Sequence, residues 1–365
     1  MIDFIPLQHY ATVVYSVMLV FIASLCVMLT THRYAVMYQP HIRNDVVRLW
    51  GWACFVLLLI LLGLRPISYA FGDMGNYNRH FLALQAGGAF RGTDPLFELL
   101  MWFFSQFLNA PLFFFFCAVV YLVPIVLASR KMLQRYWPLA FFFSIAQFDF
   151  YGYGVNGLRQ GMAASIFLLA VVAERRWQVW LWAALAIGLH KSFAIPAAVL
   201  VMVQITCNPR HYVAGWVGCL IVAAALPGIG NMLSSSALMA GEYDNYIDPG
   251  TVFVEQLSTV GFRVDFLLYS LLPILIGGYF LFLRKVRDPF YSRLYCLYVG
   301  CNAFWLIMMH TVVSNRIAYL SWFLMGFAIA YPLVRFRGMP AQHQVFSVTL
   351  LVFYLFSFVT HTWLR

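Results

Sequence analysis

Charged residues are scarce in this sequence. Only 10% of the 365 residues are charged, 63% are hydrophobic, and the mean hydropathy is +0.81. No polar block is long enough to form a separate folded domain. This composition excludes a soluble globular protein, which needs far more charge on its surface. We therefore expect a single integral membrane domain over residues 1–365.

Signatures of metal and disulfide chemistry are also missing. The seven cysteines stand singly in apolar runs, without a Cys-x-x-Cys motif. They are most simply small core residues. No cluster has metal-ligand spacing, so we expect neither a metal nor another cofactor. The net charge of +10 is better explained by membrane topology than by nucleic acid, which is not an expected partner.

The first apolar stretch lacks the features of a cleavable signal peptide. It has no basic segment before it and no Ala-x-Ala-like exit, so we expect a retained span. The apolar stretches predict an all-α polytopic fold with about twelve transmembrane helices, within a range of ten to fourteen. They are 10–30, 49–64, 111–129, 137–151, 158–173, 178–190, 193–206, 213–230, 265–283, 294–310, 317–334 and 345–363.

The connections between these stretches differ in charge. Alternate connections hold 15 of the 23 Lys and Arg residues and only three of the 13 acids. The positive-inside rule places these basic connections in the cytoplasm and both termini outside. The basic set comprises 31–48, 130–136, 174–177, 207–212, 284–293 and 335–344.

Two connections on the predicted outer side are too long to be turns. These are the external loops 65–94 and 231–264. If the apolar stretch 96–109 crossed the membrane, the basic connections would no longer all lie on one side. It therefore predicts a re-entrant or interfacial helix. The stretch 178–190 rises about 20 Å, against a hydrocarbon thickness of about 30 Å. Short spans of this kind predict a cavity that opens to the outer side.

A glycine-rich aromatic stretch, 151–163, interrupts the apolar pattern in the middle of the chain. Asn156, Arg159 and Gln160 follow one another at i, i+3 and i+4, so on a helix they share one face. An arginine in apolar surroundings requires a partner or a water-filled cavity. The simpler alternative is an arginine at a helix end that snorkels to the interface.

Three predicted helices begin on the outer side with a cation near their first turn. The cations are Arg159, Lys191 and Arg316, and Ser192 is a plausible N-cap beside the second. Cations are disfavoured at the positive end of a helix dipole. Three of them on one face suggest that an anion lies between them.

The outer loop supplies two further cations, Arg65 and Arg79, which suggest a polyvalent anion such as a lipid pyrophosphate. Each cation could instead pair with a carboxylate that locks the helical bundle. His190 alone would more often be a hydrogen-bonded packing histidine, but its neighbours make it a candidate base. The carboxylates available for pairing are Asp73, Glu98, Asp149, Glu255 and Asp265.

Several motifs, in this order, resemble the EpsG branch of Wzy-type bacterial polysaccharide polymerases. The resemblance extends over about residues 60–320. The motifs are Arg65-Pro66, Gly72-Asp73-x-x-x-Tyr77, Asp94-Pro95-Leu96-Phe97-Glu98, Asn156-Gly157-Leu158-Arg159-Gln160-Gly161-Met162-Ala163, His190-Lys191-Ser192-Phe193-Ala194-x-Pro196 and Asn315-Arg316-Ile317.

The resemblance implies a GT-C-like fold in the bacterial cytoplasmic membrane. It implies a polymerase that joins undecaprenyl-pyrophosphate-linked repeat units on the outer face of the membrane. Its partners would be the donor glycan and the acceptor glycan, each linked to undecaprenyl pyrophosphate. The lipid bilayer is a further partner, and a chain-length regulator is a candidate. We predict an inverting transfer, with Asp73 as first and His190 as second choice for the base.

The remaining site assignments complete this prediction. Pyrophosphate contacts are expected from Arg65, Arg159, Lys191 and Arg316. Two other functions stay open. One is a lipid-linked oligosaccharide flippase, which would need inverted repeats and a path through both leaflets. The other is an O-antigen ligase or acyltransferase, with a similar topology but a different acceptor. The expected supporting residues are Tyr77, Arg79, Asn156, Gln160, Ser192 and Asn315.

Overall fold

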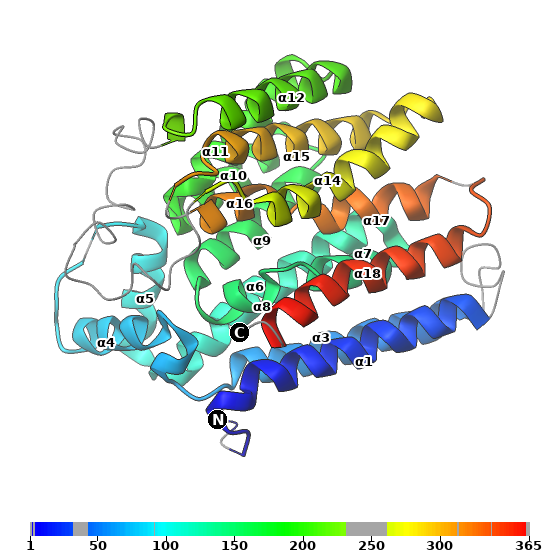
Figure 1. Cartoon of the computed structure of the whole chain (residues 1–365). Coiled ribbons are helices and arrows are strands. Elements are labelled where there is room, and N and C mark those ends of the chain that lie inside the picture. Colours follow the sequence, from blue (N-terminus) through cyan, green and yellow to red (C-terminus); the bar gives the residue numbers. More distant parts are fainter. Residues whose placement is uncertain are drawn as a thin grey trace. The chain divides into compact units, whose positions relative to one another are not determined.

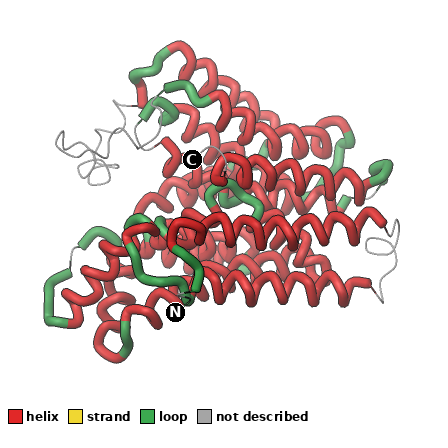
Figure 2. The backbone as a smooth tube through the Cα atoms, turned by 60° about the horizontal axis from the view of Figure 1, so that its bottom comes forward, coloured by secondary structure: helices red, strands yellow, loops and turns green. Residues whose placement is uncertain are grey.

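The computed structural model describes residues 2, 4–31, 43–90, 92–230, 261–311, 314–336 and 338–362. Within these residues the chain is helical and contains no strand (Figure 2). It divides into two compact units. The first comprises Met1–Phe193 and Leu333–Arg365, and the second Ala194–Pro332. The predicted loop 231–264 lies almost wholly outside the described residues.

The first unit contains helices from both ends of the chain (Figure 1). They are α1 (Tyr10–Thr31), α3 (Arg43–Gly63), α4 (Met74–Gln85), α5 (Pro95–Phe107), α6 (Ala110–Leu133), α7 (Trp137–Ile145), α8 (Phe150–Val155), α9 (Leu158–Val172), α10 (Arg176–Leu189) and α18 (Gln342–Thr362), with 3-10 turns at Leu7–His9, Tyr69–Phe71, Gln134–Tyr136 and Lys191–Phe193.

The first and last helices of the chain, α1 and α18, pack against each other in opposite directions (Figure 1). The Tyr354 hydroxyl donates to the Tyr15 carbonyl (2.5 Å), and the Cys26 thiol approaches the Ser347 carbonyl at 3.4 Å. Because the residue numbers in these pairs run in opposite senses, the start of α1 and the end of α18 lie at the same end of this unit.

Helices α6 and α9 run side by side and end together. Lys131 near the end of α6 forms an ion pair with Glu174 just after α9 (3.6 Å). The helix axis is about 32 Å long from Lys131 back to Ala110 at the start of α6, and about 22 Å long from Glu174 back to Arg159 near the start of α9. The start of α9 is therefore recessed by roughly 10 Å from the start of α6.

A turn at Gln134 separates α6 from α7. Gln134 has a φ of 50°, and α6 and α7 pack against each other on either side of it. A positive φ breaks a right-handed helix. The helical run Ala110–Ile145 is therefore a hairpin rather than one long span, although its length and hydropathy alone would allow one.

Glycine permits a close approach where α8 meets α9. A Cβ on Gly161 would lie 2.4 Å from the Tyr153 carbonyl oxygen and 3.2 Å from the Tyr121 ring. The corner therefore needs a glycine here for steric reasons. The position of this corner changes the prediction that Asn156, Arg159 and Gln160 share a helix face. Helix α9 begins at Leu158, so Asn156 lies in the corner and does not share a helix face with the other two.

The second unit has its own helices and core. It contains α11 (Ala194–Ile205), α12 (Pro209–Ala225), α14 (Val264–Gly278) with a π turn (Tyr279–Leu283), α15 (Pro289–Ile307), α16 (Ser314–Trp322) and most of α17 (Met325–Arg335).

Helix α15 lies at the centre of the second unit and packs on α11, α12 and α16. Three of its buried tyrosines, Tyr291, Tyr295 and Tyr298, donate to carbonyls of Ala328, Ile274 and Ser270 respectively. A buried hydroxyl without a partner would be costly. These bonds therefore let polar rings fill an apolar core.

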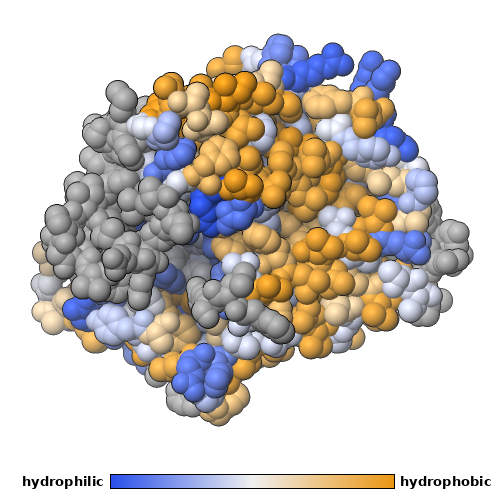
Figure 3. Space-filling model, viewed as in Figure 1, coloured by the Kyte–Doolittle hydropathy of each residue, from blue (hydrophilic) through white to orange (hydrophobic). Residues whose placement is uncertain are grey.

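The helices suit a membrane environment, and the chain is a membrane protein. Six helical segments of the described residues are long and apolar enough to span a bilayer. Apolar side chains cover much of the visible surface (Figure 3). Each apolar stretch predicted from sequence contains a helix, but the twelve-span count and the GT-C relation stay predictions. The six segments are Leu7–Thr31, Asp45–Gly63, Ala110–Ile145, Val264–Leu283, Ser314–Arg335 and Gln342–Thr362.

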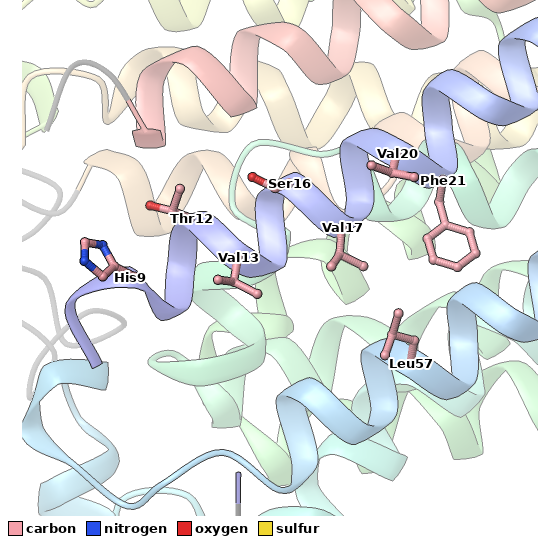
Figure 4. Close-up of a pocket in the computed structure, with 8 residues that line it drawn as sticks. All are labelled: His9, Thr12, Val13, Ser16, Val17, Val20, Phe21 and Leu57. Carbon is pink, nitrogen blue, oxygen red and sulfur yellow. The ribbon is translucent and has the colours of Figure 1, made fainter. Parts of the chain in front are cut away.

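A shallow groove runs along α1 (Figure 4). Its volume is about 510 Å³. Three polar residues, His9, Thr12 and Ser16, line it together with apolar side chains of α1 and with Leu57 of α3. None of its lining residues belongs to the polar cluster described below.

Candidate functional site

Asp94 occupies the N-cap position of α5 but does not cap it. Three other helices that start with a proline in the first turn have a capping side chain: Asn109 for α6, Asn208 for α12 and Asp288 for α15. Asp94 precedes Pro95 in the same way, yet its carboxylate makes no capping hydrogen bond. A missing cap costs about 1 kcal/mol. The Asp94 carboxylate is therefore engaged elsewhere.

The Asp94 carboxylate joins residues from three distant parts of the chain. Its Oδ2 accepts a hydrogen bond from Arg159 Nη1 at 2.5 Å, and its Oδ1 accepts one from the Lys191 backbone N–H at 3.0 Å. The His190 Nδ1 lies 3.3 Å from both oxygens. We call Tyr77, Thr93, Asp94, Arg159, His190 and Lys191 the Asp94 cluster.

The surroundings of Asp94 keep it ionised despite its burial. Its side chain is only 2% exposed. Burial acts to raise the pKa, but the His190 hydrogen bond, the charges of His190 and Arg159 and the Lys191 amide together hold the pKa of Asp94 below its usual value. The cluster thus contains a fixed carboxylate that can accept hydrogen bonds but cannot donate one.

Arg159 is held by its partners while part of it stays accessible. Its Nε donates to the Tyr77 hydroxyl at 3.2 Å, and Nη1 also reaches Thr93 Oγ1 at 3.5 Å. The guanidinium side chain is 29% exposed, and no hydrogen bond from Nη2 is found among the described residues. An oriented guanidinium with a donor left over is suited to bind an oxyanion.

A second polar contact joins the α8–α9 corner to the start of α4. The Asn156 Oδ1 accepts a hydrogen bond from the Asp73 backbone N–H at 2.7 Å. Gly72 precedes this bond with a φ of 64°, and a Cβ on it would lie 2.4 Å from Asn156 Oδ1. The Asp73 carboxylate accepts from Asn76 Nδ2 (3.4 Å) and interacts electrostatically with Arg159. Asp73 therefore lies beside the Asp94 cluster.

A comparison with known families settles the relationship of this chain. Residues 49–365, most of its length, match the EpsG family. The chain belongs to the EpsG family. The resemblance found in its motifs is confirmed, and membership indicates a polymerase-like function in polysaccharide biosynthesis. Neither a curated protein nor a solved structure matches the chain.

Other predicted site residues of this EpsG family protein lie apart from the cluster contacts. Arg65 is 2% exposed, and its guanidinium donates to the Leu62 carbonyl and, at 3.2 Å, to that of Val155. It therefore ties the end of α3 to the end of α8. Arg79 is exposed and donates to Asn76 Oδ1 at 2.7 Å.

The other predicted residues occupy helix starts. Gln160 is buried in the first turn of α9. The helix expected to start at Ser192 begins instead as a 3-10 turn, Lys191–Phe193, and α11 follows from Ala194. Asn315 and Arg316 lie in the first turn of α16, in the second unit. Their proposed participation in one site with Arg159 stays a prediction.

Sequence reasoning assigned no role to Asp94 in this EpsG family protein. An Asp-Pro pair before an apolar run predicts an ordinary N-cap. The three-dimensional contacts are needed to show that the carboxylate turns away from its own helix. Within the described residues, no group of three His, Cys, Asp or Glu side chains is arranged to hold a metal ion.

Proposed function

We propose that this EpsG family protein joins undecaprenyl-pyrophosphate-linked oligosaccharide repeat units on the outer face of the bacterial cytoplasmic membrane. The observation that carries the proposal is the Asp94 cluster, where Arg159, His190 and the Lys191 backbone meet on one carboxylate. This brings a cation for a phosphate and a candidate base into one place, as polymerisation from a lipid pyrophosphate requires. The proposed fold is GT-C-like, with both termini outside.

The location of the cluster supports this function. It lies at the recessed start of α9, at the opposite end of that helix from the Lys131–Glu174 pair. The charge pattern predicts that the Lys131 end is cytoplasmic. A site below the outer surface suits the pyrophosphate of a lipid whose chain stays in the bilayer.

The proposed reaction is a direct displacement at the anomeric carbon of the donor glycan. The acceptor sugar hydroxyl forms the new C–O bond, and its proton passes to Nε2 of His190. The bond to the pyrophosphate breaks, and undecaprenyl pyrophosphate leaves with the electron pair. Arg159 and the Lys191 ammonium stabilise the developing negative charge. One displacement inverts the anomeric centre.

We take His190 as the base in preference to Asp73. The imidazole is held against Asp94. The Asp73 carboxylate accepts a hydrogen bond from Asn76 within α4, and the Asp73 backbone N–H donates to Asn156. Arg65 supports the scaffold in this proposal, because its Nη1 and Nη2 donate to backbone carbonyls. Arg316 is proposed as a further phosphate contact.

A complementation experiment tests the proposal. A strain lacking the protein is supplied with wild type, Arg159→Ala or His190→Ala at matched membrane levels, and its lipid-linked glycans are separated by size. We expect polymer from wild type and single repeat units from both variants. The matched control is Lys131→Ala, which removes an ion-paired cation at the other end of α9 and should leave polymer intact.

The same separation distinguishes the alternatives. Repeat units trapped inside the cell would indicate a flippase, and polymer retained on its lipid would indicate a ligase. Full-length polymer in both Arg159→Ala and His190→Ala would refute the site.

A further inference from the structure

Asp94 gives up an interaction that similar residues in this protein keep. Asn109, Asn208 and Asp288 each accept a backbone N–H at the start of their helices, at 3.1, 3.1 and 2.8 Å respectively. Asp94 starts a helix in the same way and makes no such bond. An aspartate at this position is expected to cap. Its carboxylate is instead held away from α5 by its three partners.

The two oxygens of Asp94 have different partners, which fix the plane of the carboxylate. Arg159 donates to Oδ2, and the Lys191 N–H donates to Oδ1. The His190 Nδ1 lies 3.3 Å from both oxygens, so it is equally distant from the two acceptors. Because Lys191 follows His190 directly, the same carboxylate holds both the ring and the backbone that carries it.

This geometry determines where the imidazole carries its proton. An ionised carboxylate only accepts hydrogen bonds, so Nδ1 must be the donor. A neutral imidazole has a single N–H, which leaves the lone pair on Nε2. The His190 side chain is 12% exposed, so water has little access to compete for this contact.

We infer that Asp94 is a positioning residue that holds His190 in the Nδ1–H tautomer, so that Nε2 faces the acceptor hydroxyl as the base. The inference rests on the proposed function for its chemistry, and on the contacts of Asp94 for its geometry. The Asp94 carboxylate therefore has two roles: it orients the base His190 and it anchors Arg159. The resulting order, carboxylate then imidazole then hydroxyl, is a general way to activate an oxygen nucleophile.

The test measures the tautomer and the reaction separately. Protein labelled with nitrogen-15 histidine is placed in lipid nanodiscs, and the His190 signals are identified from their loss in His190→Gln. We expect wild type to show the Nδ1–H tautomer. Asp94→Asn should shift the ring to the Nε2–H tautomer, because the asparagine amide can donate to Nδ1.

Activity of the same samples is followed with a purified lipid-linked repeat unit. Asp94→Asn should lower kcat by about 10²–10⁴-fold, the range for loss of a general base, with a much smaller rise in KM because Arg159 loses its charged partner. Asp94→Glu, which keeps the carboxylate, should recover part of the rate. The matched control for the tautomer is Tyr77→Phe, which removes a different Arg159 partner and should leave the His190 signals unchanged.

The outcomes separate the inference from the proposed function. An Nε2–H tautomer in wild type, or an unchanged tautomer in Asp94→Asn, overturns the inference even if Arg159→Ala is inactive. A wild-type rate in Asp94→Asn overturns it as well. Full activity of both Arg159→Ala and His190→Gln overturns the proposed site itself.

Discussion

The corner between α8 and α9 offers a stringent test of the packing, through the substitution Gly161→Ala. The new methyl group would lie 2.4 Å from the Tyr153 carbonyl oxygen, whereas an ordinary C···O contact is about 3.3–3.6 Å. Relief requires a backbone shift of about 1 Å. Overpacking of this kind costs about 1–3 kcal/mol. We expect Gly161→Ala to lower the free energy of unfolding by about 2 kcal/mol.

Gly152, in the same glycine-rich stretch, provides the matched control. A Cβ on Gly152 would meet nothing within 4 Å. Alanine in a helix is favoured over glycine by about 0.5–1 kcal/mol, so Gly152→Ala should stabilise slightly. Both variants can be compared with wild type by SDS-induced unfolding in mixed micelles. Equal stability of the two alanine variants would show that the described α8–α9 contact is wrong.

Three further predictions concern other residues. Arg65→Leu should destabilise the protein by at least about 2 kcal/mol in the same unfolding assay, because two buried carbonyls lose their donor; normal stability with weakened pyrophosphate binding would instead show that Arg65 binds substrate. The folded-state pKa of Asp94 is depressed, so its ionisation stabilises the fold above the unfolded pKa of about 3.9, and the gain is lost as pH falls through the folded value. The difference in Tm between wild type and Asp94→Asn should therefore be larger at pH 5 than at pH 3. A difference that grows between pH 5 and pH 3 would contradict the depressed pKa. The hydrogen bond with Cys296 (3.9 Å between the Sγ atoms) lowers the pKa of Cys207 to about 7, with burial acting against this shift and the charge of Arg293 adding to it. Maleimide labelling of Cys207, identified by its loss in Cys207→Ser, should therefore reach half its plateau rate near pH 7 rather than near pH 9.

The helices could be predicted from sequence because long apolar stretches have few alternatives in a bilayer. Interruptions within those stretches were harder to see. The stretch 137–151 is split between α7 and α8, and 317–334 between α16 and α17. Hydropathy averages over such breaks, whereas the chain must turn where packing and backbone geometry require it.

The candidate site was only partly predictable. Arg159 and His190 stood out because cations and imidazoles are rare in apolar surroundings. Asp94 did not, because its local sequence is that of a helix cap and its partners lie 65 to 97 positions away in sequence. Arg65 was predicted to contact the pyrophosphate because it is a cation in the outer loop. Its guanidinium donates to the Leu62 and Val155 carbonyls, and its contact with substrate stays a prediction.

The central claim is that the lipid pyrophosphate binds at the Asp94 cluster. A cryo-electron microscopy structure of the protein with a non-hydrolysable polyprenyl pyrophosphate analogue tests this most directly. We predict phosphate oxygens within hydrogen-bond distance of Arg159 and Lys191, with Nε2 of His190 facing the position of the acceptor hydroxyl. Pyrophosphate bound elsewhere, with the Asp94 cluster unchanged and out of contact, would contradict the account.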